Sequence, residues 1–298
     1  MASPALYQTL SVPTSLLGEG PVWDEQNQRI YWVDILNGLI YTYHPVTRAY
    51  RQWEVPGMVG AIALCEDGRM ITALRSGFVF VDLDSGAVEP IIDPEAHLSD
   101  NRFNDGKCDP AGRFWAGTMD TNEQAATGSL YSLSADLNCT KRLSAVTISN
   151  GLAWTSDHKT MYYIDTPTLS VAAFDFELAT GAITNRRTVI EIPEEEGFPD
   201  GMCIDTEDKL WIAHWGGWQV ARWDPLGGKK LSSIRLPAAQ ITSCAFGGIA
   251  LEDLYITSAK VGLSEAQQKE QTLAGSLFVI ENCGYQGRPA TRFKTDNL

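Results

Sequence analysis

The stretch DGKCDPAGRFWAGTM (105–119) carries the pattern that decides the fold. A polar residue and a glycine open a short apolar run, a turn of Asp, Pro and Gly follows, and a second run rich in aromatic residues ends it. The same pattern recurs along the chain at intervals of 40 to 50 residues. The further copies are EGPVWDEQNQRIYWVDI (19–35), VGAIALCEDGRMITAL (59–74), NGLAWTSDHKTMYYID (150–165), DGMCIDTEDKLWIAHW (200–215) and a weaker SCAFGGIALEDLYITS (243–258).

This repeat predicts a β-propeller, because periods in the forties with several short strands are typical of four-stranded antiparallel blades. The apolar runs are short, β-branched and aromatic, and they lack the i, i+3, i+4, i+7 spacing of a helical repeat. Third strands such as 38–45 and fourth strands such as 47–54 follow the paired runs. We therefore expect an all-β chain: a single six-bladed β-propeller, one domain over 1–298, closed by residues 6–10 pairing with the last blade.

Composition and charge restrict the partners. The 298 residues are 44% hydrophobic and 20% charged, and the net charge is −14. Such acidity argues against nucleic acid and against an anionic membrane surface. The N-terminal stretch has no basic and apolar secretory signal, and no run approaches the length of a membrane-spanning helix. The six cysteines form no C-x-x-C pair, so we expect a cytoplasmic protein with reduced, buried cysteines.

Oxygen-bearing side chains occupy one phase of the repeat. The innermost strands of a propeller line its channel. Residues at the equivalent position of each repeat therefore lie at the same level along the channel axis. The position before the glycine is Glu19, Asp105, Asn150 or Asp200 in four copies, with Asn104 beside it in one of them. Such oxygens bind hard divalent cations, and the four histidines fall at other phases. The pattern predicts a metal in the central channel; the alternative is that these residues only shape turns.

Five segments resemble one known family. They are LGEGPVW (17–23), NRFNDGKCDPAGRFWAGTM (101–119), SNGLAW (149–154), FPDGMCID (198–205) and TSCAFGG (242–248). The sequence resembles the family of regucalcin (senescence marker protein), the gluconolactonases and the luciferin-regenerating enzymes over nearly the whole chain. The resemblance implies a six-bladed propeller with one divalent metal in the channel, and in many members hydrolysis of sugar lactones.

The resemblance also implies roles for individual residues. Glu19, Asn150 and Asp200 match the family's metal ligands, and Asp200 matches its catalytic acid/base. Arg102 and Asn104 in NRFND match substrate-binding residues.

One further substrate contact departs from the family pattern. The family has a Glu after GTM, and the matching substrate-binding position here is Asn122, with Glu123 next to it. The segment between GTM and GSLYSL is also shorter than in animal regucalcin. These differences affect the expected sugar preference.

We therefore expect metal-dependent hydrolysis of a sugar (aldono-) lactone to the aldonic acid. The metal would polarise the carbonyl, and Asp200 would move a proton between water and the ring oxygen. The alternatives are a calcium-binding regulatory protein of regucalcin type with little turnover, and a propeller hydrolase of another ester. Ca²⁺ is the favoured cofactor, with Zn²⁺, Mg²⁺ and Mn²⁺ open. The expected partner is a small-molecule sugar lactone, and the chain is expected to be a monomer or a weak homo-oligomer.

Overall fold

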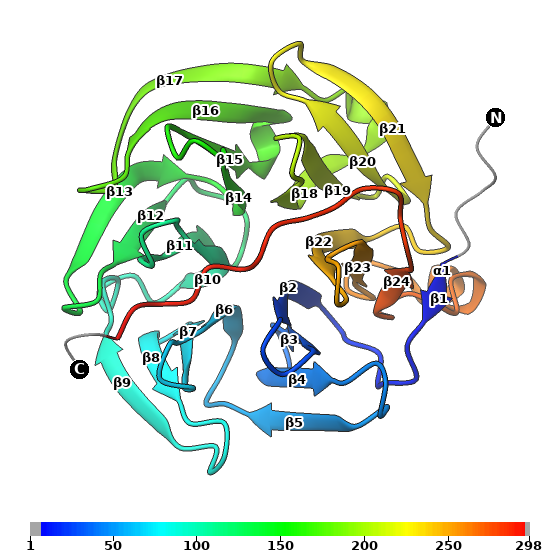
Figure 1. Ribbon diagram of the computed structural model, residues 1–298, viewed down its shortest axis with the longest axis horizontal. Coiled ribbons are helices and arrows are strands. Elements are labelled where there is room, and N and C mark those ends of the chain that lie inside the picture. The colour runs from blue at the N-terminus through cyan, green and yellow to red at the C-terminus, as the bar shows by residue number, and fades with distance from the viewer. Residues whose placement is uncertain (1–6, 296–298) are drawn as a thin grey trace.

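Six four-stranded antiparallel sheets surround a central channel in the computed structural model, which describes residues 7–295 (Figure 1). This arrangement confirms the predicted all-β, six-bladed propeller. Blade 1 is β2 (Gly18–Asp24), β3 (Arg29–Asp34), β4 (Leu39–Tyr43) and β5 (Tyr50–Glu54). Blade 2 is β6 (Val59–Leu64), β7 (Met70–Leu74), β8 (Gly77–Val81) and β9 (Val88–Ile92). Blade 3 is β10 (Asn101–Cys108), β11 (Phe114–Asp120), β12 (Gly128–Leu133) and β13 (Cys139–Val146).

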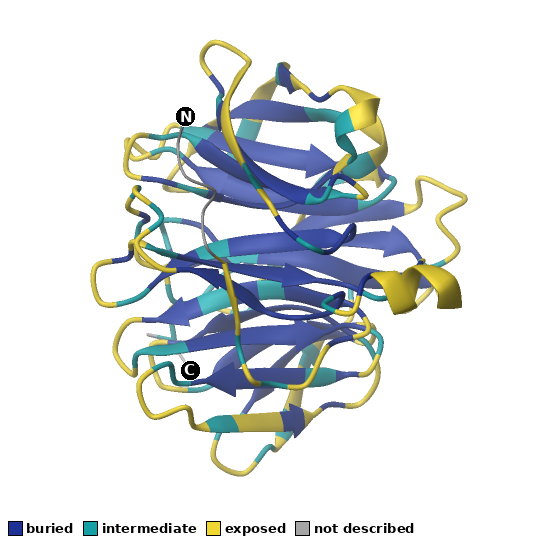
Figure 2. Cartoon of the chain, turned by 90° about the vertical axis from the view of Figure 1, so that its right-hand side faces the viewer, coloured by how far each residue is buried: buried dark blue, intermediate teal, exposed yellow. Residues whose placement is uncertain are grey.

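The second half of the ring continues in the same order. Blade 4 is β14 (Ser149–Trp154), β15 (Thr160–Asp165), β16 (Ser170–Glu177) and β17 (Ala182–Glu191). Blade 5 is β18 (Phe198–Ile204), β19 (Leu210–Trp215), β20 (Gln219–Asp224) and β21 (Lys229–Arg235). Blade 6 is β22 (Ile241–Gly247), β23 (Asp253–Ser258), β24 (Phe278–Ile280) and β1 (Gln8–Thr9). Between β23 and β24 lies a short exposed helix, α1 (Glu265–Glu270), which projects from the ring (Figure 2).

The ring is closed by the N-terminal strand. In β1, Gln8 pairs with Val279 and Thr9 with Phe278 of β24, so the expected pairing of residues 6–10 with the last blade is confirmed for β1. Residue 6 lies outside the described residues. Closure leaves the last blade with the same four strands as the others, which protects the sheet edges.

The core lies between neighbouring blades. Trp32, Trp115 and Trp211 occupy equivalent places on second strands, and each is at most 1% exposed. Each packs against apolar side chains of the adjoining blade. Burial of these large aromatic side chains contributes to the stability of the interface between blades. The buried strands form the body of the ring, while connecting loops are exposed (Figure 2).

Aspartates after the first strands fix the hairpin turns. Asp109 accepts hydrogen bonds from the Arg113 side chain at 2.6 Å and from the Trp115 indole at 2.8 Å. Asp205 does the same for Arg222 at 2.8 Å and the Trp211 indole at 3.0 Å. These fully buried charges are stable because each has both an ionic partner and N–H donors.

A C-terminal strap, defined as residues 282–294, crosses one mouth of the channel (Figure 1). It leaves blade 6 with the Gly287 amide donating to Leu251, and it reaches blade 2 with the Phe293 amide donating to Leu64. Phe293 is fully buried among residues of blades 2 and 3. The strap therefore ties together blades that are far apart in sequence. No helix among residues 7–295 is long and apolar enough to cross a membrane.

Candidate functional site in the central channel

Irregular strand register marks the part of the channel where the predicted residues lie. Strand pairing shifts between Glu19 and Val22 on β2, and between Asn150 and Leu152 on β14. The same shift occurs on β10 after Phe103 and on β18 after Pro199. Such bulges re-aim side chains relative to a regular strand. The position that recurs in the sequence repeat therefore coincides with a β-bulge that recurs on the innermost strands.

The structure brings the three carboxylates of this phase together. Glu19, Asp105 and Asp200 are 3%, 5% and 6% exposed. Burial, then Asp200, then Asp105 raise the pKa of Glu19 well above its ordinary value. Burial, then Asp105, raise the pKa of Asp200 well above its ordinary value, and burial raises the pKa of Asp105. The channel therefore holds a buried cluster of negative charge that a cation or a proton stabilises.

Asn150 presents an oxygen from the neighbouring strand. Thr166 donates its hydroxyl hydrogen to the Pro199 carbonyl at 2.8 Å, so it can only accept from the Asn150 Nδ2, also at 2.8 Å. This relay fixes the orientation of the amide, because Nδ2 must face Thr166. The Asn150 Oδ1 atom is buried and has no hydrogen-bond partner among the described residues. An orphaned buried oxygen of this kind calls for a positively charged or hydrogen-donating ligand.

These side chains fit a hard divalent cation. Glu19 and Asp200 supply carboxylate oxygens, and Asn150 supplies the amide oxygen that lacks a partner. Within residues 7–295, no group of three or more His, Cys, Asp or Glu side chains has the arrangement of a metal site. The predicted set therefore depends on the Asn150 amide as its third ligand.

Arg102 and Asn104 form a rigid pair on β10. The Arg102 Nη1 donates to the Asn104 Oδ1 at 2.7 Å and to the Phe103 carbonyl at 3.0 Å. The Asn104 Nδ2 donates to the Ser149 carbonyl, beside Asn150, at 2.8 Å. Burial lowers the pKa of Arg102 to about 10, opposed by Glu123, Glu19 and Asp200. Arg102 is thus a cation at neutral pH, and its remaining N–H groups are available for an oxygen-rich ligand.

Asn122 and its neighbour Glu123 lie in the loop after β11. The Asn122 Nδ2 donates back to Asp120 at 3.2 Å, and Asn122 is exposed. Glu123 is the charged group that most favours the cationic form of Arg102. The backbone of Glu123 is left-handed, with φ of 56°. In this arrangement Glu123, rather than Asn122, supplies the loop's negative charge toward Arg102.

Lys107 lies beside the carboxylate cluster, and the repeat pattern does not single it out. It follows Asp105 by two positions on β10, and its Nζ donates to the Met202 carbonyl on β18 at 2.7 Å. Its charge lowers the pKa of Asp105, against the larger effect of burial. The register shift between Phe103 and Gly106 interrupts the regular alternation of β10 at Asp105, so the i, i+2 spacing in the sequence does not identify this pair.

The two ends of the channel differ. The innermost strands run from the face that carries Glu123 and Thr166 toward the face crossed by the C-terminal strap. On the strap side, a cavity of about 330 Å³ is lined by Asp105, Lys107 and strap residues 288–291. Arg102, near the start of β10, is not among the residues that line this cavity.

His214 lies outside this arrangement. Its Nδ1 atom contacts the Glu196 carbonyl at 3.0 Å, and its ring stacks on Trp223. Burial lowers the pKa of His214 to about 4, so the ring is neutral at physiological pH. It anchors the loop before β18.

Comparisons with known proteins agree with the geometry. The model of the SMP-30/Gluconolactonase/LRE-like region matches residues 17–260. Regucalcin of Danio rerio is 40% identical over 275 residues, covering 92% of this chain and 93% of that protein. A Bacillus subtilis (strain 168) protein named "Putative sugar lactone lactonase YvrE" is 39% identical over 277 residues, covering 92% of this chain and 95% of its own.

A solved structure shares the whole fold. A calcium-binding protein, regucalcin, from Agrobacterium tumefaciens str. C58 superimposes with a TM-score of 0.93 at 27% identity, covering 97% of this chain and 98% of that one. The family resemblance expected from the sequence motifs is thereby confirmed. This chain belongs to the SMP-30/gluconolactonase/LRE-like family.

Proposed function

We propose that this protein hydrolyses a sugar lactone to the corresponding aldonic acid at the mouth of the channel opposite the strap. The observation that carries the proposal is the buried cluster of Glu19, Asp105 and Asp200 beside the orphaned Asn150 Oδ1. Family membership supports the same reaction class, because a relative at 39% identity is named as a sugar lactone lactonase.

A divalent cation is part of this proposal. Glu19, Asn150 and Asp200 would hold it, and the bound cation would supply electrophilic polarisation of the lactone carbonyl. Oxygen ligands favour Ca²⁺, and Mg²⁺, Mn²⁺ and Zn²⁺ also accept such ligands. The name of the Agrobacterium relative as a calcium-binding protein supports Ca²⁺ as the first choice.

The chain's own residues bind and orient the sugar. Arg102 has free guanidinium N–H groups that suit the hydroxyls and carbonyl of an aldonolactone. Asn104 is held by hydrogen bonds on both sides of its amide, so it keeps Arg102 in place. Preorganised donors of this kind lower the cost of reaching the transition state.

Asp200 is the residue that we assign to proton transfer. It accepts a proton from the attacking water and returns it to the ring oxygen as the ring opens. Burial, then the charge of Asp105, raise the pKa of Asp200 well above its ordinary value, so this carboxyl holds a proton more readily than an exposed one. Asp105, deeper in the channel beside Lys107, tunes the charge of the cluster.

A pH-stat assay tests the proposal. The purified protein is given five- and six-carbon aldonolactones, with excess EDTA or with EDTA followed by excess Ca²⁺. We expect base uptake far above the spontaneous rate with Ca²⁺ and near the spontaneous rate with EDTA. Uptake only on simple aryl esters would indicate hydrolysis of another ester.

A second candidate function is calcium binding with little turnover, favoured by the calcium-binding relative. The same samples separate the two by calorimetry: heat of Ca²⁺ binding without lactone hydrolysis supports this candidate and contradicts the lactonase.

A further inference from the structure

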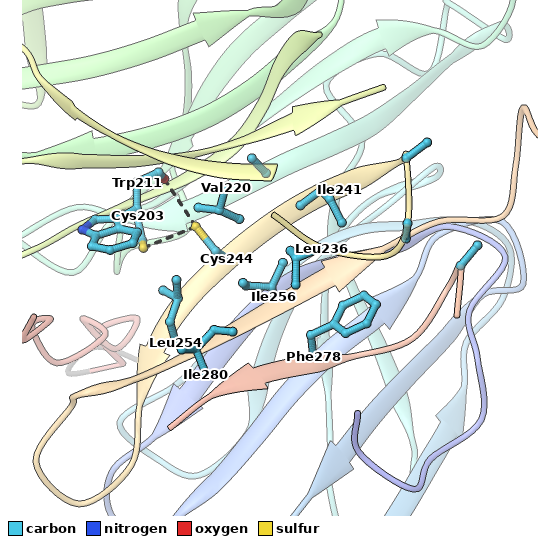
Figure 3. Packing of buried hydrophobic residues seen from close by; sticks show 14 of the residues in the cluster. Cys203, Trp211, Val220, Leu236, Ile241, Cys244, Leu254, Ile256, Phe278 and Ile280 are labelled. Atoms are coloured by element: carbon cyan, nitrogen blue, oxygen red, sulfur yellow. Dashed lines mark hydrogen bonds between the residues drawn. The ribbon is translucent and has the colours of Figure 1, made fainter. Parts of the chain in front are cut away.

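A pair of cysteines lies on the innermost strands of blades 5 and 6, on the strap side of the channel. The Cys203 Sγ on β18 and the Cys244 Sγ on β22 are 3.6 Å apart (Figure 3). They are 8% and 2% exposed. Among residues 7–295, no other two sulfurs are within hydrogen-bonding contact. These thiols therefore differ from the other buried cysteines by facing each other across a blade boundary.

The backbone around this pair is already closely packed. Gly201 lies two residues before Cys203, and a Cβ there would meet the Ser243 Oγ at 2.2 Å. Only glycine permits such an approach of two strands. A disulfide has an S–S distance near 2.05 Å, so the two sulfurs need to close by about 1.5 Å.

Both thiols also border a space that small reagents can enter. Cys203 and Cys244 line the cavity of about 330 Å³ beneath the C-terminal strap. Cys244 donates to the Trp211 carbonyl at 3.3 Å, which holds its sulfur toward Cys203 (Figure 3). Proximity and access together are what a disulfide site requires.

We propose that Cys203 and Cys244 form a reversible disulfide under oxidation, which cross-links the innermost strands of blades 5 and 6. The two thiols give up two protons and two electrons, and one S–S bond forms. Hydrogen peroxide takes up the two protons and two electrons and yields two waters, or an azo reagent such as diamide takes them up and becomes a hydrazine. A dithiol such as dithiothreitol reverses the step.

Oxidation at this site is slow and its product stabilises the ring. Burial, together with Cys244, raises the pKa of the Cys203 thiol well above its ordinary value, so little thiolate is present. The disulfide closes a loop of about forty residues, which restricts the unfolded chain. A rise of several degrees in Tm follows for a chain of this size.

The test does not depend on the lactonase reaction. Native protein is treated with diamide, alkylated and digested, and the cross-link is mapped by mass spectrometry. We expect a product lighter by two hydrogen atoms, a Cys203–Cys244 peptide, a higher Tm, and full reversal by dithiothreitol. Each of C203S and C244S abolishes the mass change, while C139S, at a half-buried cysteine, retains it. A cross-link at another pair, no cross-link, or an unchanged Tm would overturn the proposal.

Discussion

In protein stripped of divalent cations, Asp200→Asn should become increasingly more stable than the parent protein as pH rises. Burial and Asp105 raise the pKa of Asp200, and Asp200 in turn raises the pKa of Glu19. A carboxyl with a raised folded pKa holds more protons in the folded chain than in the unfolded chain. The free energy of unfolding therefore falls with pH from the unfolded pKa near 4 upward to the folded pKa.

The magnitude follows from proton counting. Each proton held in excess by the folded chain lowers the free energy of unfolding by about 1.4 kcal/mol per pH unit. Asn at position 200 removes the Asp200 contribution and weakens that of Glu19, since both carboxyls belong to one buried cluster. The difference in free energy of unfolding between Asp200→Asn and the parent protein is the stability gap. It should grow by up to about 1.4 kcal/mol per pH unit for each excess proton that the substitution removes from the folded chain.

Urea unfolding in EDTA between about pH 5 and 7 measures this gap, followed by the fluorescence of the nine tryptophans. Burial lowers the pKa of His214 to about 4, so its charging in the unfolded chain changes stability in the same range. This contribution is common to both proteins and cancels in the difference.

A matched control removes a half-buried carboxylate that lies outside the channel. Ser85 hydrogen bonds lower the pKa of Asp82, so the gap for Asp82→Asn should stay constant above about pH 5. Added Ca²⁺ at about 100 times its Kd should stabilise the parent by about 2.7 kcal/mol and favour it over Asp200→Asn. A gap for Asp200→Asn that stays constant with pH in EDTA would refute the buried-cluster reasoning.

Three further outcomes are expected. Arg102→Lys should raise KM for an aldonolactone about tenfold with a smaller change in kcat, because lysine lacks the planar set of donors; an unchanged KM in steady-state kinetics would remove Arg102 from the site. Glu123→Gln should raise KM by about threefold or more through Arg102, whereas Asn122→Ala stays within about twofold; the reverse order would assign the contact to Asn122. Asp109→Ala should lower the free energy of unfolding by about 3–5 kcal/mol in urea, because it leaves the Arg113 charge without its partner; a loss below about 1 kcal/mol would contradict this.

The propeller is predictable because the pattern that specifies a blade is local and repeated. Each copy encodes two strands and the turn between them, and Asp109 and Asp205 fix two of these turns through neighbours in the same copy. The N-terminal closure was also predictable, because a propeller without it leaves an open edge. The C-terminal strap was not, since residues 282–294 form no repeat and are held by scattered contacts to blades 2, 3, 5 and 6.

The channel carboxylates were predictable for a related reason. Residues at equivalent positions of the repeat lie at the same level along the channel axis. Glu19, Asp105 and Asp200 were therefore expected to lie close together. The orientation of Asn150 was not predictable, because it depends on Thr166 and the Pro199 carbonyl in two other segments. Contacts that loop residues make do not recur at the interval of the repeat, so the repeat does not predict them.

The effect of Glu123 on the pKa of Arg102 could not be predicted from the sequence for the same reason. Its position depends on a left-handed backbone in the loop after β11. The resemblance aligns Asn122 with the family's glutamate, whereas the charge that most favours the cationic form of Arg102 is that of the neighbouring Glu123.

The most direct measurement of the central claim is the initial rate of aldonolactone hydrolysis by the parent protein and by Asp200→Asn, both saturated with Ca²⁺, in a pH-stat. The proton-transfer role of Asp200 predicts a rate at least about 100-fold lower for Asp200→Asn, with the folded structure retained by circular dichroism. A rate for Asp200→Asn within about twofold of the parent protein would contradict the proposed chemistry at this channel.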